Sequence, residues 1–307
     1  MGEKYRIFKL YREKPLYQLF VSLMIITGVG ITLSVVFILA GRLVFSSDLS
    51  VLEKASSALS NKDISFLRYF LIIQDVSLFI IPSVLILVMI KPENETGLTE
   101  LKMPQLKEIG LAIILTFCVL PVTSFTGQVN SAMHLPVWLS GVEHWMSEKE
   151  DQADNLINVI VASDNFWMMV LNLFTIALIP AIAEEMIFRG VFQKIFERLF
   201  KSGHIAIWVT AFIFSAIHLQ FYGFIPRFIL GLVFGYLFFW SGTLWLPIIS
   251  HFVNNAFPVI LAYIQGIEKL NAPTDTPLWK QAIYLPLPIV IILLILVYFR
   301  SKNISSR

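Results

Sequence analysis

Two adjacent carboxylates, Glu184 and Glu185, and an arginine, Arg189, stand in a stretch of chain that is otherwise apolar. An ionised side chain in a membrane-like surrounding is costly unless it is paired or faces a wet cavity, so it indicates a functional site. On a helix, Glu185 and Arg189 lie four residues apart on one face and can neutralise each other. Glu184 points about 100° away around the helix and has no local cation. Glu184 is therefore the candidate for chemistry.

Three further polar residues follow within apolar sequence: His218, His251 and Asn255. His251 and Asn255 are four residues apart and share a helical face. A glutamate and two histidines can hold zinc, with Glu184, His218 and His251 as ligands and one position open for water. The same set can instead activate water directly, with Glu184 as general base. His251 and Asn255 would then donate hydrogen bonds to the developing oxyanion. A buried polar network that only fixes helix packing is the structural alternative.

The composition places these residues in a membrane protein. Hydrophobic residues make up 57% of the 307 residues and charged residues 14%, whereas a soluble domain has about 25% charged residues. Apolar windows of about 20 residues, long enough to span a bilayer, predict about eight transmembrane helices. These windows lie near 16–45, 66–90, 109–127, 166–188, 204–220, 224–241, 244–265 and 281–299. We expect an all-α, multi-pass membrane protein whose later helices form a cavity that faces the cytoplasm.

The loop charges predict the orientation of these helices. Basic residues mark cytoplasmic loops, and here they follow the second, fourth and eighth windows: Lys91, Lys102, Lys107, Arg189, Lys194, Arg198, Lys201, Arg300, Lys302 and Arg307. The segment 128–164 is acidic and has Lys149 as its only Lys or Arg, so it should lie outside, as a small cap or an interfacial helix. Both termini are then cytoplasmic. No continuous basic patch exists, so nucleic acid is not an expected partner.

At these residues the sequence resembles the CAAX protease and bacteriocin-processing family, which includes the type II CAAX prenyl endopeptidases. The family pattern is Glu-Glu-x-x-x-Arg, then Phe-x-x-x-His, then His-x-x-x-Asn or Asp, on successive helices. The chain has these three motifs in order, at Glu184 to Arg189, Phe214 to His218 and His251 to Asn255. The resemblance covers roughly residues 165–262. Three motifs in order are much more specific than any one of them.

The resemblance implies an intramembrane endopeptidase. Glu184 and His218 would activate the water, while His251 and Asn255 would stabilise the oxyanion. The ion pair within the first motif would hold the site together. The family is often labelled metallopeptidase, and a metal-independent glutamate mechanism is also argued for it, so the cofactor is either none or a divalent metal such as zinc. The lack of a compact two-ligand helix favours the metal-independent mechanism.

The substrate implied by the resemblance is a peptide or a lipidated protein at the lipid bilayer, cut in a membrane-associated or C-terminal segment. Eukaryotic relatives remove a C-terminal tripeptide after a prenylated cysteine, and bacterial relatives are associated with bacteriocin maturation, immunity or regulation. The predicted division is an N-terminal transmembrane region, 1–164, with about three helices and an external loop. A peptidase region, 165–307, follows, with its core motifs in 184–255 and a C-terminal helix.

Two other functional classes compete with a peptidase. A non-catalytic membrane scaffold or regulator, such as a bacteriocin immunity protein of the same family, would use these residues only for packing. A proton-coupled transporter also needs intramembrane acids and histidines, but transporters often repeat such features in both halves, and here the first half lacks counterparts. Other intramembrane proteases fit poorly, because His-Glu-x-x-His is absent and Asp75 is the only aspartate well inside a predicted span. We interpret Asp75 as packing polarity or cavity lining.

Overall fold

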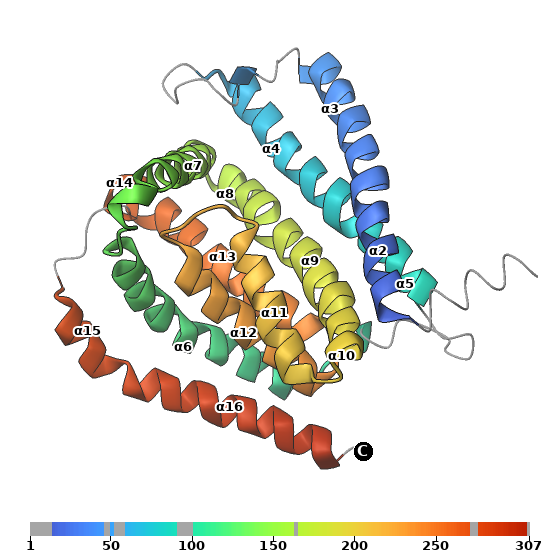
Figure 1. Ribbon diagram of the computed structural model, residues 1–307. Coiled ribbons are helices and arrows are strands. Elements are labelled where there is room, and N and C mark those ends of the chain that lie inside the picture. The colour runs from blue at the N-terminus through green and yellow to red at the C-terminus, as the bar shows by residue number, and fades with distance from the viewer. Residues whose placement is uncertain are drawn as a thin grey trace, which may run out of the picture.

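The computed structural model describes residues 14–45, 50–51, 59–90, 101–162, 165–270 and 276–305 (Figure 1). Within these residues every regular element is a helix, which confirms the predicted all-α class. Lys91, Arg307 and both chain termini, which entered the orientation argument, lie outside the described residues.

Seven of the helices in these ranges are long and apolar enough to cross a membrane, and the protein is an integral multi-pass membrane protein. They are Pro15–Phe45, Asn61–Met89, Leu106–Ser131, Phe166–Phe200, Phe224–Ser241, Trp245–Gln265 and Pro286–Ile304. The predicted span 204–220 is instead the 14-residue helix α11, Gly203–Ala216. At a rise of 1.5 Å per residue this helix is about 21 Å long, shorter than the hydrocarbon core of a bilayer. The chain leaves the helix before His218, and Leu219 is left-handed, with φ 55°.

The later helices form a bundle around the long helix that carries the two glutamates (Figure 1). This long helix consists of α8 (Phe166–Asn172), η7 (Leu173–Leu178), α9 (Ile179–Glu185), η8 (Met186–Gln193) and α10 (Lys194–Phe200). Its neighbours in the bundle are α11, α12 (Phe224–Ser241) and α13 (Trp245–Gln265), and α6 (Leu106–Ser131) packs against α12 and α13. Apolar side chains of α6, α12, α13 and the C-terminal helix α16 (Pro286–Ser305) make the largest core.

The N-terminal helices pack on one flank of this bundle. They are α2 (Pro15–Ile25), η1 (Ile26–Gly30) and α3 (Ile31–Phe45), followed by α4 (Asn61–Asp75), η4 (Val76–Ile80) and α5 (Ile81–Ile90). Helices α2, α4 and α5 contact the long helix, while α16 covers α6 and α12 on the other flank, joined to the bundle through the short helices α14 (Ile267–Leu270) and α15 (Leu278–Tyr284). The first half of the chain therefore supports the helix that carries the glutamates.

Helices α11 and α12 approach each other closely at two glycines. A Cβ atom at Gly231 would lie 2.9 Å from Cβ of Ala211, and one at Gly235 would lie 2.9 Å from Cγ2 of Ile207. Both contacts are shorter than carbon atoms tolerate, so only glycine fits at this approach. The Gly-x-x-x-Gly pair thus permits close helix packing.

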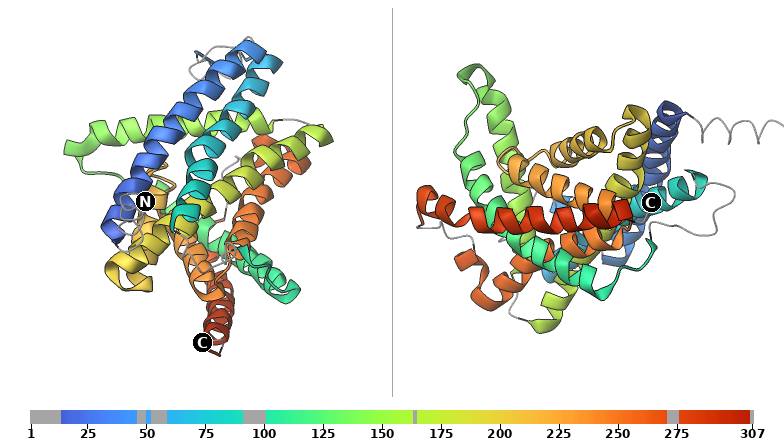
Figure 2. Two further views of the ribbon diagram at one scale, coloured as in Figure 1. Left: turned by 90° about the vertical axis from the view of Figure 1, so that its right-hand side faces the viewer. Right: turned by 90° about the horizontal axis from the view of Figure 1, so that it is seen from below.

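The segment 140–161 forms one helix, α7 (Ser140–Val161), which crosses the end of the bundle (Figure 2). The carbonyl of Ile160 near its C-terminus accepts hydrogen bonds from Nη2 of Arg68 on α4, at 3.0 Å, and from Nδ2 of Asn172 on α8, at 2.9 Å. The backbone N–H of Tyr222 donates to Oε2 of Glu150 at 3.0 Å. The predicted cap or interfacial helix is therefore a helix tied to the bundle on two sides.

The two ends of the bundle differ in charge. At one end the start of α6 meets the ends of α12 and α16, as the 2.7 Å hydrogen bond from Thr243 Oγ1 to the carbonyl of Lys102 shows. This end carries seven of the described basic residues assigned to cytoplasmic loops: Lys102, Lys107, Lys194, Arg198, Lys201, Arg300 and Lys302. The assignment of Arg189 to such a loop was wrong, because Arg189 is buried inside the bundle in its ion pair with Glu185. The acidic helix α7 lies at the opposite end. The separation agrees with the predicted loop pattern, and the cytoplasmic position of the basic end stays a prediction.

Candidate active site

Glu185 and Arg189 form a fully buried ion pair on the long helix. Nη1 of Arg189 donates to Oε1 of Glu185 at 2.9 Å, and both side chains are 0% exposed. Nη2 of Arg189 donates to the carbonyl of Gly231 at 3.1 Å, which the close approach of α12 makes available. The rings of Phe214 and Phe234 lie 5.0 and 5.7 Å from the guanidinium carbon, so aromatic faces complete its surroundings. The structure therefore contains the ion pair between Glu185 and Arg189 that their four-residue spacing predicts.

The backbone around the two glutamates is irregular. The π-helical segments η7 and η8 lie directly before and after α9. Such wide turns change which face a side chain occupies and often occur at functional sites. Pro180, in the first turn of α9, cannot donate a helical hydrogen bond, and it lines the cavity that Glu184 faces. The long helix therefore has π-helical turns on both sides of the segment that carries the glutamates, instead of regular α-helix throughout.

His251 on α13 connects the two glutamates. Its Nδ1 lies 2.8 Å from Oε1 of Glu185, and because an ionised carboxylate only accepts, Nδ1 carries the hydrogen. Its Nε2 lies 3.8 Å from Oε2 of Glu184. The side chain is buried and is not part of the cavity wall. His251 is therefore directed at Glu184 from behind.

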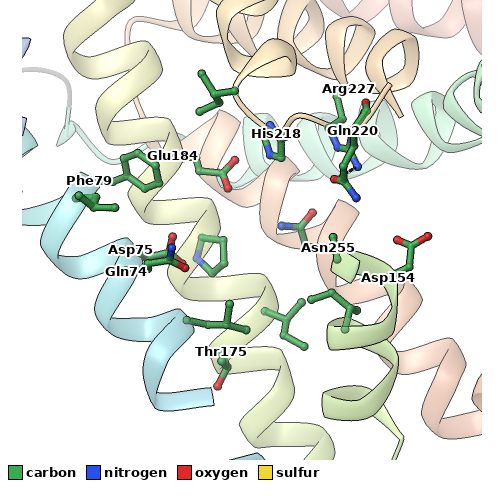
Figure 3. Close-up of a pocket in the computed structure, with 17 residues that line it drawn as sticks. Gln74, Asp75, Phe79, Asp154, Thr175, Glu184, His218, Gln220, Arg227 and Asn255 are labelled. Carbon is green, nitrogen blue, oxygen red and sulfur yellow. Dashed lines mark hydrogen bonds between the residues drawn. The ribbon is translucent and has the colours of Figure 1, made fainter. Parts of the chain in front are cut away.

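His218 follows α11 and points into the cavity. Its Nδ1 lies 2.7 Å from the carbonyl oxygen of Phe214 and must donate to it, because a carbonyl has no hydrogen to give. In the neutral imidazole, Nε2 then keeps its lone pair for the cavity. Figure 3 shows the side chains of Glu184, His218 and Asn255 pointing into one cavity. The volume of this cavity is about 470 Å³. The structure thus brings one residue of each predicted motif to one cavity.

Asn255 is held by its neighbour in the sequence. Nδ2 of Asn254 donates to Oδ1 of Asn255 at 3.1 Å, so the amide group of Asn255 remains free to donate. The sequence motif names only the second of these asparagines. The only sequence feature that could have pointed to Asn254 is that two asparagines stand side by side on an apolar helix.

Three elements from the predicted N-terminal region, α4, η4 and α7, also line the cavity, and η4 contributes Leu78 and Phe79. Gln74 and Asp75 come from α4, and Ala153, Asp154 and Ile157 come from α7. None of the three sequence motifs includes a residue of these elements. The cavity wall therefore includes residues from both sides of the predicted boundary at 164/165, and Asp75 is a cavity-lining residue.

The three predicted zinc ligands do not form a preorganised metal site. Among the described residues, no group of three or more His, Cys, Asp or Glu side chains is arranged to hold a metal ion. Nδ1 of His218 and Nδ1 of His251 nevertheless each bond to an oxygen atom, and bonds of this type orient histidines that bind metals through the other ring nitrogen. His134 and His144, near the start of α7, are exposed and pair separately with Glu143, at 2.8 Å, and Glu148, at 3.2 Å.

Residues 166–257 match the model of a protein family described as type II CAAX prenyl endopeptidase Rce1-like. The uncharacterised protein YpbD of Bacillus subtilis (strain 168) is 33% identical over 85 residues, which is 26% of this chain and 40% of that protein. The chain thus spans less than half of this relative's length, and no solved structure matches it. The matched segment contains all three motifs and the cavity-facing residues that they supply. Over residues 166–257 the chain is therefore similar to the Rce1-like type II CAAX prenyl endopeptidases, the family whose pattern its motifs resemble.

Proposed function

We propose that this protein is a CAAX-type intramembrane endopeptidase in which Glu184 is the general base. The observation that carries the proposal is the contrast between two adjacent carboxylates. Glu185 is buried and bound to Arg189 and His251, whereas Glu184 faces the cavity and its nearest described cation partner is Nε2 of His251, at 3.8 Å. Different surroundings give neighbouring carboxylates different roles. The first neutralises buried charge, and the second is available to accept a proton.

The reaction that fits this arrangement is the attack of water on a peptide carbonyl. A water molecule between Glu184 and Nε2 of His218 gives its proton to Glu184 as its oxygen attacks the carbonyl carbon. The carbonyl oxygen becomes an oxyanion, to which the amide group of Asn255 donates a hydrogen bond. Glu184 then returns the proton to the leaving nitrogen as the carbon–nitrogen bond breaks. The products are a new carboxyl terminus and a new amino terminus.

His251, Glu185 and Arg189 support this chemistry from behind the cavity. Because Nε2 of His251 faces Glu184, we propose that the main role of His251 is to position the carboxylate of Glu184. Its positive charge, when protonated, also contributes to stabilising the oxyanion together with Asn255. The bonds from Glu185 and Arg189 hold the imidazole and α12 in place. In the zinc alternative, Glu184, His218 and His251 would be the residues that hold the metal, and the metal would supply Lewis-acid chemistry.

The test compares peptide termini in membranes and medium, by mass spectrometry, between cells with the wild-type protein and cells with Glu184→Gln at the same level. Glu148→Gln is the matched control, because it makes the same chemical change at an exposed carboxylate on α7. We expect a set of termini that appears with the wild type and with Glu148→Gln and is lost with Glu184→Gln. Identical termini in all three would contradict peptidase activity and favour the scaffold.

Metal dependence is tested on the purified protein with the peptide found in that comparison. We expect cleavage to survive dialysis against EDTA and 1,10-phenanthroline, with less than one zinc ion per protein by mass spectrometry of the metal. Loss of cleavage that zinc restores would favour the zinc alternative.

A further inference from the structure

Arg227 lies in the same cavity as the proposed catalytic residues. It belongs to the first turn of α12, and Figure 3 shows it beside Gln220, on the side of the cavity away from Asp75. Arg227 donates to Oε1 of Gln220 through Nη2, and its Nη1 lies 3.5 Å from the carbonyl oxygen of the same residue. A guanidinium has five N–H donors. Several donors of Arg227 therefore remain for a ligand in the cavity.

The position of Arg227 is built by its surroundings. A Cβ atom at Gly223 would lie 2.3 Å from Nη1 of Arg227, so the glycine leaves the space that the guanidinium occupies. The start of α12 is held by Oδ1 of Asn130, which accepts from the N–H of Ile225 at 2.8 Å. Oγ of Ser215 donates to the carbonyl of Phe224 at 2.6 Å. The side chain is thus placed by α6, α11 and the loop before α12.

The cavity wall carries three acids, Asp75, Asp154 and Glu184, and the guanidinium of Arg227. Among its lining residues, Arg227 is the one permanent cation, and Asp75 and Gln74 line the wall on the other side of Glu184 (Figure 3). An extended peptide that passes Glu184, His218 and Asn255 toward the wall away from Asp75 would meet the guanidinium of Arg227, with Asp154 on the same side. Guanidinium groups bind carboxylates through two parallel, charge-assisted hydrogen bonds.

We infer that Arg227 is a specificity-determining residue that binds a carboxylate of the substrate beside the bond attacked from Glu184. The inference rests on the proposed function, because it assigns the substrate group for that site. The carboxylate is either the C-terminus of the peptide or an acidic side chain close to the cleaved bond. Both sources have the same chemistry, and they can be separated with synthetic peptides.

The acids of α7 are the competing partners of Arg227. Glu150 and Asp154 are close enough to act on it electrostatically, yet within the described ranges no carboxylate lies within 4 Å of the guanidinium. Glu150 already accepts from the N–H of Tyr222. Burial raises the pKa of both acids, against the opposing effect of Arg227, so their charge is a weaker competitor than that of an exposed carboxylate. In the absence of substrate these acids compensate the arginine from a distance.

Binding is measured on the full-length Glu184→Gln protein in lipid nanodiscs, so that no cleavage occurs. The probe is a fluorescent decapeptide pool of random sequence, prepared with a free C-terminal carboxylate, with a C-terminal carboxamide, and as a carboxamide with a glutamate near the end. Fluorescence anisotropy gives the affinity for each form. Three further variants are made in the Glu184→Gln background. Arg227→Gln removes the guanidinium, and Arg227→Lys keeps the positive charge. The control Arg198→Gln removes an arginine at the opposite end of the bundle.

We expect a carboxylate form to bind about tenfold more tightly than the plain carboxamide, as a charge-assisted pair allows. Arg227→Gln should remove this preference, Arg227→Lys should keep part of it, and Arg198→Gln should leave it unchanged. Preference for the free terminus identifies the C-terminus as the ligand, and preference for the added glutamate identifies a side chain.

Equal affinity for acid and amide in the protein with Arg227 overturns the inference. An unchanged preference in Arg227→Gln, with a lower melting temperature, also overturns it and makes Arg227 the counter-ion of α7. A cleavage assay with the wild type separates the two proposals. No cleavage of any pool, with the carboxylate preference intact, would contradict the proposed function and leave the binding assignment standing.

Discussion

At the scale of single residues, the site depends on two neighbouring carboxylates that have opposite surroundings. Helix geometry alone predicts that Glu185 pairs with Arg189 and that Glu184 points elsewhere. The bond between Glu185 and His251 joins residues 66 positions apart, so only the folded chain reveals it. Oε1 of Glu185 accepts from both Arg189 and His251, which makes this carboxylate the centre of the buried network.

The first prediction concerns this buried pair. Arg189→Met removes the guanidinium and leaves Glu185 with one cation partner fewer in an enclosed site. Breaking a buried ion pair costs about 3–5 kcal/mol of folding free energy, so we expect a large fall in the melting temperature in detergent. The double variant Glu185→Gln with Arg189→Met should lose less, because no uncompensated charge remains. A double variant that is less stable than Arg189→Met would contradict this account.

The second prediction concerns Asn254, which the sequence motif does not include. Asn254→Ala removes the hydrogen bond to Oδ1 of Asn255 and lets that amide rotate. Misplacement of a catalytic group lowers the rate of the chemical step, so we expect kcat to fall about tenfold with little change in KM or melting temperature. Asn254→Asp has the same shape and no amide donor, and it should behave like Asn254→Ala. Full activity in Asn254→Asp would show that the bond does not position Asn255.

At the scale of helices, the site depends on the contact between α11 and α12. The glycines of α12 let its backbone come close enough for the carbonyls of Gly231 and Gly235 to accept from Arg189 and from Gln193, at 3.1 Å in both cases. The glycine spacing predicts the close packing. No sequence signal predicts that α11 ends at Ala216, because the apolar sequence continues beyond it. The loop that follows contains the left-handed Leu219 and is bonded to α7 through the N–H of Tyr222.

The third prediction tests this contact. Gly231→Ala forces the new Cβ against Ala211, and such overpacking costs about 1–3 kcal/mol. We expect a lower melting temperature and lower activity, because the acceptor of Arg189 moves. Gly110→Ala on α6 is the control, since a Cβ there meets nothing within 4 Å. Equal melting temperatures for the two variants would contradict the close approach.

At the scale of the whole molecule, the cavity lies between the N-terminal helices, the bundle and α7. The basic end of the bundle and the acidic helix α7 lie on opposite sides, as the loop charges predict. The cytoplasm-facing cavity remains a prediction. Because α7 forms part of the wall, the acidic end is the competing entrance.

The fourth prediction tests the orientation with membrane-impermeant thiol reagents. Cys118 is the only cysteine, so Cys118→Ala provides the background for single cysteines. We expect Lys201→Cys to react only from the cytoplasmic side and Glu148→Cys only from outside, because positive charge stays inside. Reaction of both from one side would contradict the loop assignment. Ala153→Cys then reports the entrance, and the cytoplasm-facing cavity requires that it react from the side of Lys201.

The sequence by itself determined the all-helical membrane class, the ion pair, and the three motifs that supply Glu184, His218 and Asn255. These features follow from composition, apolar length and helical spacing, which are local properties of the chain. The tertiary structure alone decided that α4 and α7 complete the cavity, that His251 faces Glu184 from behind, and that Arg227 lies in the same space. Each of these results joins residues far apart in the chain. Such contacts depend on how helices cross and turn, which no local pattern of residues records.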